Sequence, residues 1–331
     1  MYFRRKNQGM EWINVGGNML SNFIISIEAV LPIIIMMGIG MLVRRAGMLD
    51  EHDVKKMNKV VFTVFFPVLM FSNLYGKDLG AVVDWRLIIF GVAALLIIYA
   101  LAVIFVLRIE PNPKTRGAMI QGIYRSNFVV MGVPVVSNIF GAENLTLTSL
   151  MVTIIVPMYN VLAVLTLEAF RGGRPSLRQI SRQLAKNPLI LGALAGIVVM
   201  GLGIRLPDAI ENTVSSMAGV ATPMALLTLG AFFDFQSVAA RRRDIAICLI
   251  GRLLVVPAVG LGIGILMGFR DVALITLLAM FASPCAVAGF PMAQAMDSDV
   301  ELAGDVIVFS SLFGCFTMFF WIFVTKSLGL F

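Results

Sequence analysis

Two short stretches, Met131-Gly132-Val133-Pro134 and Ala288-Gly289-Phe290-Pro291, decide how this chain folds. Each lies near the far end of a long apolar segment, and they stand about half a chain apart. Proline has no backbone N–H and clashes with the carbonyl four residues earlier, so it interrupts a helix. Within a bilayer, the freed polar groups need protein, water or a ligand as partners. Two interrupted helices at matching places in two half-chains indicate the binding site of a secondary transporter.

The composition is that of an integral membrane protein. Hydrophobic residues make up 59% of the 331 residues, whereas a soluble domain has roughly 45–50%. Residues 87–107 and 145–167 contain no charged side chain, and each range reaches the roughly 20 apolar residues that a bilayer requires. We therefore expect a multi-pass protein of the cell (inner) membrane, surrounded by the lipid bilayer.

The net charge of +7 does not indicate nucleic acid as a partner, because the basic residues lie in short loops between apolar segments. In such loops Lys and Arg set the orientation and contact anionic lipid headgroups. Cys248, Cys285 and Cys315 lie within apolar segments, which is typical of small packing residues. His52 is the single histidine, so we expect no metal site and no cofactor.

The apolar segments predict an all-α integral membrane fold with ten transmembrane helices. Their expected positions are residues 23–43, 57–75, 86–108, 116–140, 145–168, 187–204, 212–233, 245–268, 271–296 and 303–326. Residues 1–22 form a short external N-terminal tail. A basic cytoplasmic linker at residues 171–186 separates a first five-helix repeat (23–170) from a second one (187–331).

The orientation follows from the distribution of basic residues. The loops after the odd-numbered spans contain sixteen Lys and Arg residues, and the opposite side contains eight. Because loops rich in Lys and Arg stay in the cytoplasm, both termini are expected outside it.

Residues of the same type recur at a constant spacing in the two halves. The pairs 156 positions apart are Pro32 and Pro188, Gly40 and Gly196, and Pro67 and Pro223. A unit of five spans crosses the membrane an odd number of times, so its copy must be inverted. The predicted fold is therefore a pair of inverted repeats whose broken fourth and ninth helices cross.

Broken helices create a candidate substrate site. Each second half-helix starts with free N–H groups and a partial positive charge, which together favour an anion. The candidate substrate-binding residues are Arg125, Asn127, Gly132, Pro134, Tyr159, Asn160, Ser283, Pro284, Gly289 and Pro291. The alternative is a pair of proline kinks with a purely structural role, in which Asn127 replaces backbone partners at the break.

Four ionisable residues fall within the spans, where charges are costly and usually face the protein interior or water. Arg125 and Arg252 are either counter-ions for an anionic substrate or structural residues, as members of ion pairs between helices or as snorkelling side chains. Glu28 and Asp305 lie near span ends, and they are either proton carriers or solvated or paired carboxylates. We group Glu28, Asp305 and Arg252 as candidates for proton or ion coupling.

Several motifs together resemble the auxin efflux carrier family, over nearly all of residues 23–327. They are Asn58, Phe66-Pro67, Arg125-Ser126-Asn127-Phe128, Gly132-Val133-Pro134, Pro157, Tyr159-Asn160, Asn187-Pro188-Leu189-Ile190 and the two prolines of residues 271–296. The resemblance implies a crossover fold like that of bile-acid symporters, with substrate bound by Asn127 and the backbone around Pro134 and Pro291. It also implies a scaffold (spans 1, 2, 6 and 7) against which the other spans move.

We therefore expect a secondary transporter, active or facilitative, of small organic anions that carry carboxylates, working by alternating access at the crossed helices. A sodium-coupled organic-anion symporter of the bile-acid type and a non-transporting membrane receptor are the alternatives. An enzyme is not expected, because no histidine lies in a span and Cys285 has no evident base partner. A proton is a second expected partner, and the apolar scaffold helices suggest a homodimer.

Overall fold

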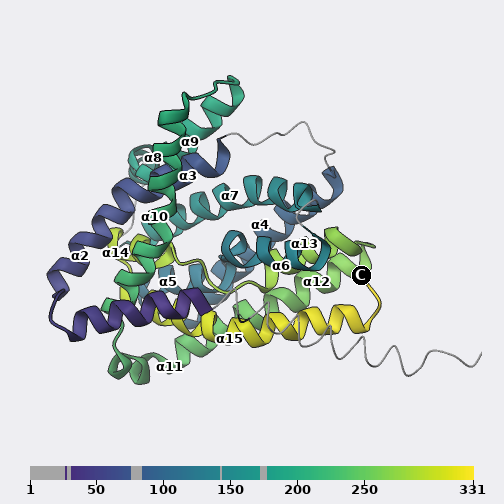
Figure 1. The fold of residues 1–331 in the computed structure, drawn as a ribbon. Coiled ribbons are helices and arrows are strands. Elements are labelled where there is room, and N and C mark those ends of the chain that lie inside the picture. Colours follow the sequence, from purple (N-terminus) through teal and green to yellow (C-terminus); the bar gives the residue numbers. More distant parts are fainter. Residues whose placement is uncertain (1–26, 28–30, 76–83, 142–143, 172–176) are drawn as a thin grey trace, which may run out of the picture.

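The computed structural model describes residues 27, 31–75, 84–141, 144–171 and 177–331 (Figure 1). Regular secondary structure in these ranges is entirely helical. In chain order it comprises residues 31–45, α2 (Glu51–Val60), η1 (Val61–Phe65), α3 (Phe66–Leu74), α4 (Trp85–Ile109), α5 (Pro113–Tyr124), η2 (Phe128–Gly132), α6 (Val133–Phe140), α7 (Thr146–Phe170), α8 (Leu177–Lys186), α9 (Pro188–Gly201), α10 (Asp208–Phe232), α11 (Phe235–Ile250), η4 (Gly251–Val255), α12 (Val256–Leu266), α13 (Asp271–Ala282), α14 (Gly289–Ala295) and α15 (Val300–Ser327). The predicted N-terminal tail, residues 1–22, lies outside the described residues.

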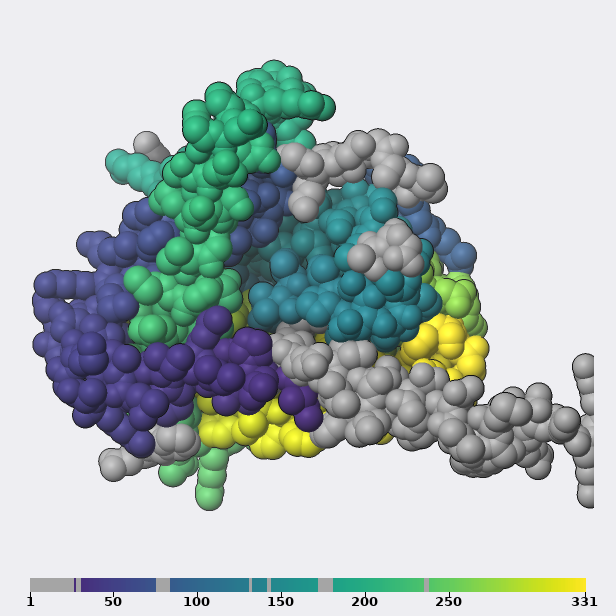
Figure 2. All heavy atoms as spheres, in the orientation of Figure 1, coloured from purple at the N-terminus to yellow at the C-terminus, as the bar shows by residue number. Residues whose placement is uncertain are grey.

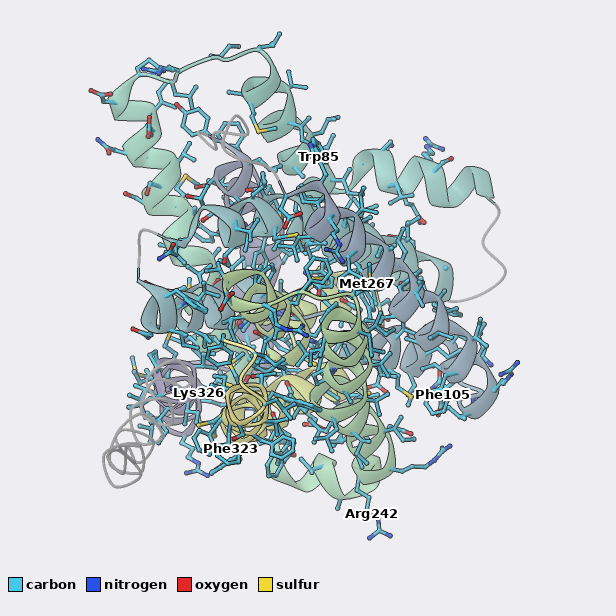
Figure 3. The ribbon with its side chains drawn as sticks, turned by 90° about the vertical axis from the view of Figure 1, so that its right-hand side faces the viewer. Trp85, Phe105, Arg242, Met267, Phe323 and Lys326 are labelled. Atoms are coloured by element: carbon cyan, nitrogen blue, oxygen red, sulfur yellow. The ribbon has the colours of Figure 1, made fainter. Side chains whose placement is uncertain are left out.

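Six of the described helices are long and apolar enough to cross a membrane. They are Glu51–Leu74, Trp85–Ile109, Thr146–Phe170, Asp208–Phe232, Val238–Leu266 and Val300–Ser327. Large apolar side chains such as Trp85, Phe105 and Phe323 are exposed on the outside of the molecule (Figure 3). An outer surface of this kind requires lipid, because water would not solvate it. The all-helical fold and the multi-pass membrane protein predicted from the sequence are confirmed.

The helices pack as two groups. The first helix group consists of residues 31–45, α2, α3, α9 and α10, which contact one another. The second helix group consists of α4–α7 and α11–α15. Figure 1 shows the first group on the left and most of the second on the right. Figure 2 shows a hollow on this face between the green atoms of α10 and the teal atoms of α7.

Glycines let helices of the first group approach closely. A Cβ at Gly230 of α10 would lie 2.0 Å from the carbonyl oxygen of Met37. A Cβ at Gly192 of α9 would lie 2.3 Å from the carbonyl oxygen of Pro67 in α3. Small residues at such crossings are typical of membrane helices, where packing replaces the hydrophobic effect as the force between helices. The first group is therefore tightly joined.

Asn58 is one of the described polar side chains that connect the two groups, and Asn160 of α7, whose Nδ2 contacts the sulfur of Met70 in α3, is another. Asn58 of α2 is buried, and its Nδ2 donates a hydrogen bond to Oε1 of Gln294 in α14. Its Oδ1 accepts a hydrogen bond of 3.3 Å from the hydroxyl of Thr228 in α10. The amide of Asn58 thus joins the first helix group to the second.

Three π-helical turns each lie just ahead of a proline. η1, η2 and η4 end two residues before Pro67, Pro134 and Pro257 respectively. Local π turns and side chains from neighbouring helices satisfy the backbone groups that a proline frees inside a membrane. At Pro257 the side chain of Trp321 does this, because its Nε1 donates to the carbonyl of Leu253, four residues earlier, at 3.0 Å.

The helix breaks differ in part from the prediction. The first segment is interrupted at residues 125–127, between α5 and η2, and not at Gly132-Val133-Pro134. The chain passes Pro134 within helix because η2 absorbs the irregularity. The second segment is interrupted at residues 283–288, ahead of Gly289-Phe290-Pro291. Ser283 is extended there (φ −62°, ψ 146°), as expected for a residue that precedes a proline.

Candidate functional site at the crossing of two interrupted helices

The two interruptions touch each other. Ser126 and Cys285 form an isolated antiparallel bridge, and the backbone N–H of Asn127 donates to the carbonyl of Pro284 at 2.8 Å. The backbone N–H of Cys285 donates to the hydroxyl of Ser310 in α15 at 3.0 Å. Part of the backbone freed by the breaks is therefore satisfied by the opposite break and by α15.

Arg252 of η4 holds the ends of both first half-helices. Its Nη1 donates to the carbonyl of Tyr124, the last residue of α5, at 2.9 Å. Its Nε donates to the carbonyl of Ser283 at 3.0 Å, and its Nη2 donates to the carbonyls of Met280, at 3.2 Å, and Phe281. The last carbonyls of a helix lack partners within the helix and carry partial negative charge. Arg252, only 1% exposed, satisfies them in α5 and α13 together.

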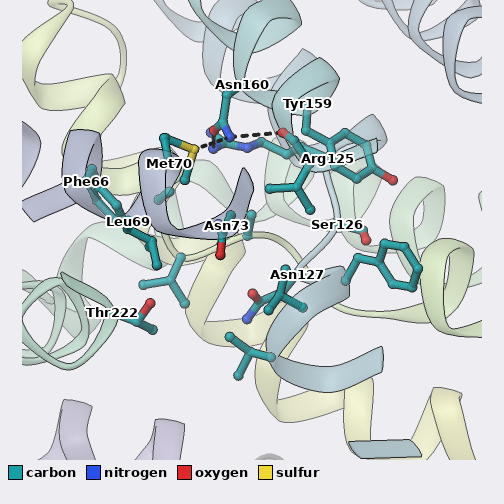
Figure 4. Close-up of a pocket in the computed structure, with 17 residues that line it drawn as sticks. Phe66, Leu69, Met70, Asn73, Arg125, Ser126, Asn127, Tyr159, Asn160 and Thr222 are labelled. Atoms are coloured by element: carbon teal, nitrogen blue, oxygen red, sulfur yellow. Dashed lines mark hydrogen bonds between the residues drawn. The ribbon is translucent and has the colours of Figure 1, made fainter. Parts of the chain in front are cut away.

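Arg125 lies at the start of the first break and contacts three other helical segments. Its Nη1 donates to Oε1 of Gln121 at 2.9 Å and approaches the sulfur of Met292 in α14. Its Nη2 donates to Oδ1 of Asn160 in α7 at 2.5 Å. The amide of Asn160 in turn donates to the carbonyl of Val156 at 2.9 Å. Figure 4 shows the ends of the Arg125 and Asn160 side chains next to each other, with a dashed line from the amide of Asn160 to the sulfur of Met70.

A cavity of about 100 Å³ opens beside this crossing, between the two helix groups. Four predicted site residues line it: Arg125, Asn127, Tyr159 and Asn160. Phe66, Leu69, Met70 and Asn73 of α3 and Thr222 of α10 form the opposite wall, and the start of η2 adjoins it. Figure 4 shows Thr222 on the far side of the cavity from Ser126, with Asn127 between them. Among the described residues that line the cavity, none is acidic.

Several buried hydrogen-bond donors at this crossing have no partner among the described residues. They are Nε of Arg125, Nδ2 of Asn127 and Nε2 of Gln121. A buried donor without a partner costs about 1–3 kcal/mol, and more if it is charged. Arg125 and Asn127 line the cavity itself, whereas Gln121 lies in a small adjoining pocket that Arg125 also borders. The arrangement can accept a ligand that is rich in acceptor oxygens.

Pro134, Ser283, Pro284, Gly289 and Pro291 are not among the described residues that line the cavity. Gly132 and Pro134 lie further along η2 and α6, and Pro291 is buried within α14. Gly289 borders the small adjoining pocket together with Gln121 and Arg125. The other two candidates contribute backbone carbonyls to the crossing. Ser283 accepts from Arg252 and Pro284 accepts from Asn127.

Asp305, one of the coupling candidates, lies apart from the cavity. Asp305 of α15 is 2% exposed, and no hydrogen-bond partner of its Oδ2 is found in the described part of the chain. It lines a separate pocket of about 200 Å³ with Arg44, Glu51, Asp234 and Glu301. Nowhere in the described part of the chain do three or more His, Cys, Asp or Glu residues come together in a way that could hold a metal ion. Glu28 falls outside the described residues.

Sequence reasoning missed the wall contributed by the first helix group. Asn73 and Thr222 face the cavity from α3 and α10. The signal for Asn73 was a lone amide in the apolar run before Tyr75, and the signal for Thr222 was a hydroxyl next to Pro223. Neither signal indicates which residue lies opposite, because that depends on how the two groups pack.

The chain is similar to known proteins over a range that includes every residue of this site. A family model described as membrane transport protein matches residues 25–322. An uncharacterized transporter of Methanothermobacter thermautotrophicus is 28% identical over 306 residues, which cover 90% of this chain and 98% of that protein. An uncharacterized transporter of Methanocaldococcus jannaschii is 21% identical over 310 residues, with the same coverage of 90% and 98%.

Proposed function

The chain belongs to the membrane transport protein family, whose members are auxin efflux carrier-like, and from that premise we propose that it is a secondary transporter of small organic anions. The substrate carboxylate binds in the cavity beside Arg125 and Asn127. Transport is active or facilitative, and it proceeds by alternating access at the crossed, interrupted helices.

The charge at the crossing is the observation that carries this proposal. Arg125 and Arg252 are 3% and 1% exposed, and neither takes part in any ion pair formed by the described residues. Arginine stays charged in proteins, and a charge inside a membrane needs compensation. An organic anion supplies it, and its carboxylate oxygens accept from the free Nε of Arg125 and the free amide of Asn127.

The size of the cavity limits the substrate. Its volume of about 100 Å³ is smaller than the roughly 150 Å³ cavity that binds benzene in another protein. Apart from its donors the wall is apolar, with Phe66 and Leu69 facing the crossing. A short carboxylic acid without an aromatic ring therefore fits best in this conformation.

We also propose two inverted five-helix repeats, residues 23–170 and 187–331, joined by the basic linker at 171–186. Support comes from helix ends that recur at nearly constant spacing. Three such pairs are Ile109 and Leu266 (157 apart), Tyr124 and Ala282 (158 apart), and Phe170 and Ser327 (157 apart). Related helices also pack alike, since Gly40 lies against α10 and Gly196 lies against α3.

The two helix groups provide elements that can move. The cavity has one wall from α3 and α10 and another from the breaks and α7. A rigid-body shift of the second group against the first would carry the crossing, with its bound anion, from one side to the other. The first group, joined by its glycine contacts, is the natural fixed part.

We propose that both termini lie outside the cytoplasm, and the distribution of Lys and Arg among the loops supports this orientation. Two of these loops lie together, because Arg243 donates to the carbonyl of Ile109 at 3.1 Å. Lys114 pairs with Asp297 at 2.8 Å at the same end. Clustering of basic loops at one end agrees with the positive-inside rule.

Reconstitution tests the proposal. Purified protein in liposomes should take up radiolabelled short mono- or dicarboxylates, with uptake reduced by an excess of the same unlabelled acid. If no carboxylate moves but one raises Tm, the protein is a receptor, because ligands stabilise the folded state by mass action. If uptake requires sodium on one side, a sodium-coupled symporter is the correct description. Protein-free liposomes are the control.

A further inference from the structure

The guanidinium group of Arg252 donates to four backbone carbonyl oxygens. Carbonyl oxygens of Tyr124, Met280, Phe281 and Ser283 converge on one guanidinium group. They come from the C-terminal ends of two half-helices, α5 and α13. Oxygens at such ends carry the negative pole of the helix dipole, and hard cations prefer oxygen ligands of this type.

No other described residue balances the charge of this guanidinium. Arg252 is 1% exposed and takes no part in the ion pairs of the described residues. Its partners are four backbone carbonyl groups and the hydroxyl of Tyr159. Because an arginine does not lose its proton in proteins, the carbonyl oxygens always face a positive charge.

The position of Arg252 relates it to the substrate cavity. Tyr124, whose carbonyl it binds, is bonded to Arg125, which lines the cavity. Ser283, whose carbonyl it also binds, is bonded to Pro284, which accepts from Asn127. The charge of Arg252 thus lies directly behind the break residues that face the substrate.

We propose that Arg252 takes the place of a bound alkali-metal ion at the crossing, so that the anion binds without a co-bound cation. This inference rests on the proposed function only for the identity of the anion. It makes Arg252 a positioning residue, which fixes both half-helix ends and supplies a permanent charge. It also predicts that sodium does not drive transport.

Chemical rescue tests the site without any substrate. In the purified full-length protein, Arg252→Ala should lower Tm by about 5 °C or more, because carbonyl oxygens in a membrane interior lose their partner. Low-millimolar guanidinium should restore part of that loss, whereas the same concentration of urea should not. Arg252→Lys should fall between the wild type and the alanine variant. Arg242→Ala, at an exposed position, is the matched control and should show neither effect.

The wild-type protein provides a second measurement, which holds even if the alanine variant fails to fold. A carboxylate that raises Tm should do so equally in sodium, potassium and choline salts. A ligand-induced shift that needs sodium would overturn the inference, and so would an unchanged Tm in Arg252→Ala or a loss that guanidinium does not restore. Absence of any carboxylate-induced shift in every salt would instead count against the proposed function, while the rescue experiment still decides the role of Arg252.

Discussion

The backbone N–H of Asn127 lies 2.8 Å from the carbonyl oxygen of Pro284, and this bond joins the two interrupted helices at their crossing. Because the backbone of Asn127 is engaged with the opposite break, its side chain is left to face the cavity, where Nδ2 has no partner. One residue therefore serves both the crossing and the candidate site.

The side chain of Asn127 can be removed without touching that backbone bond. Asn127→Ala should weaken carboxylate binding about tenfold to a hundredfold, because hydrogen bonds to charged groups are worth about 1.5–3 kcal/mol. Binding is measured as the ligand-induced shift in Tm, and transport as uptake into proteoliposomes. Asn138→Ala, at an exposed position of α6, is the control and should leave both unchanged. Normal uptake by Asn127→Ala would remove this residue from the site.

Arg125 should not tolerate replacement by lysine. The guanidinium reaches Gln121 and Asn160 at once and still has Nε free for the ligand. A lysine ammonium is a point charge without this planar geometry, so Arg125→Lys should weaken binding roughly tenfold or more. Titration of the ligand-induced Tm shift measures the change. Equal affinity in the lysine variant would show that only charge, and not geometry, matters here.

Asp305 provides the test for proton coupling. If its buried carboxyl, whose Oδ2 has no partner among the described residues, takes up a proton during transport, Asp305→Asn should abolish the response of uptake to an imposed pH gradient. The charged neighbours of its pocket are Arg44, Glu51, Asp234 and Glu301, with Arg241 paired to Glu301. Uptake is followed in liposomes with acidic or neutral exteriors. Asp208→Asn, exposed at the start of α10, should behave like the wild type, and a pH response that survives in Asp305→Asn would exclude Asp305.

The close packing of the first helix group can be tested within α10 alone. Gly230→Ala should destabilise the protein by about 1–3 kcal/mol, because its methyl group would overlap the backbone of Met37. Gly219→Ala, in the same helix, has nothing within 4 Å of the added carbon. It should be neutral or stabilising by up to about 1 kcal/mol, since alanine favours helix over glycine. Thermal unfolding in detergent compares the two, and equal Tm values would show that the helices can separate freely.

The sequence predicted residues that line the site better than it predicted where the first helix is interrupted. Arg125, Asn127, Tyr159 and Asn160 were predicted as site residues because they are polar residues within apolar spans, and all four line the cavity. The position of the first break was wrong, because local pattern assigned it to Pro134. The chain breaks earlier, where contact with the opposite break replaces helical bonds, and that contact joins residues 157 positions apart, Asn127 and Pro284.

Long-range packing explains the other differences. From the sequence, Arg252 was grouped with the candidates for ion coupling. In the structure it binds the ends of α5 and α13, which no residue near it in the sequence indicates. Asn73 and Thr222 were missed because they reach the cavity from the first helix group. Periodicity along one helix indicates which of its faces is buried, but not which partner will cover that face.

The amide of Asn58 forms a hydrogen bond that holds the two helix groups together. Its hydrogen bond to Gln294 spans the boundary across which the proposed movement takes place. A neutral hydrogen bond contributes only about 0.5–1.5 kcal/mol, so thermal motion breaks this bond readily. When it is formed, it favours the present arrangement of the two groups several-fold. This hydrogen bond thereby favours one arrangement of the two helix groups, while it adds little to the free energy that is needed to leave that arrangement.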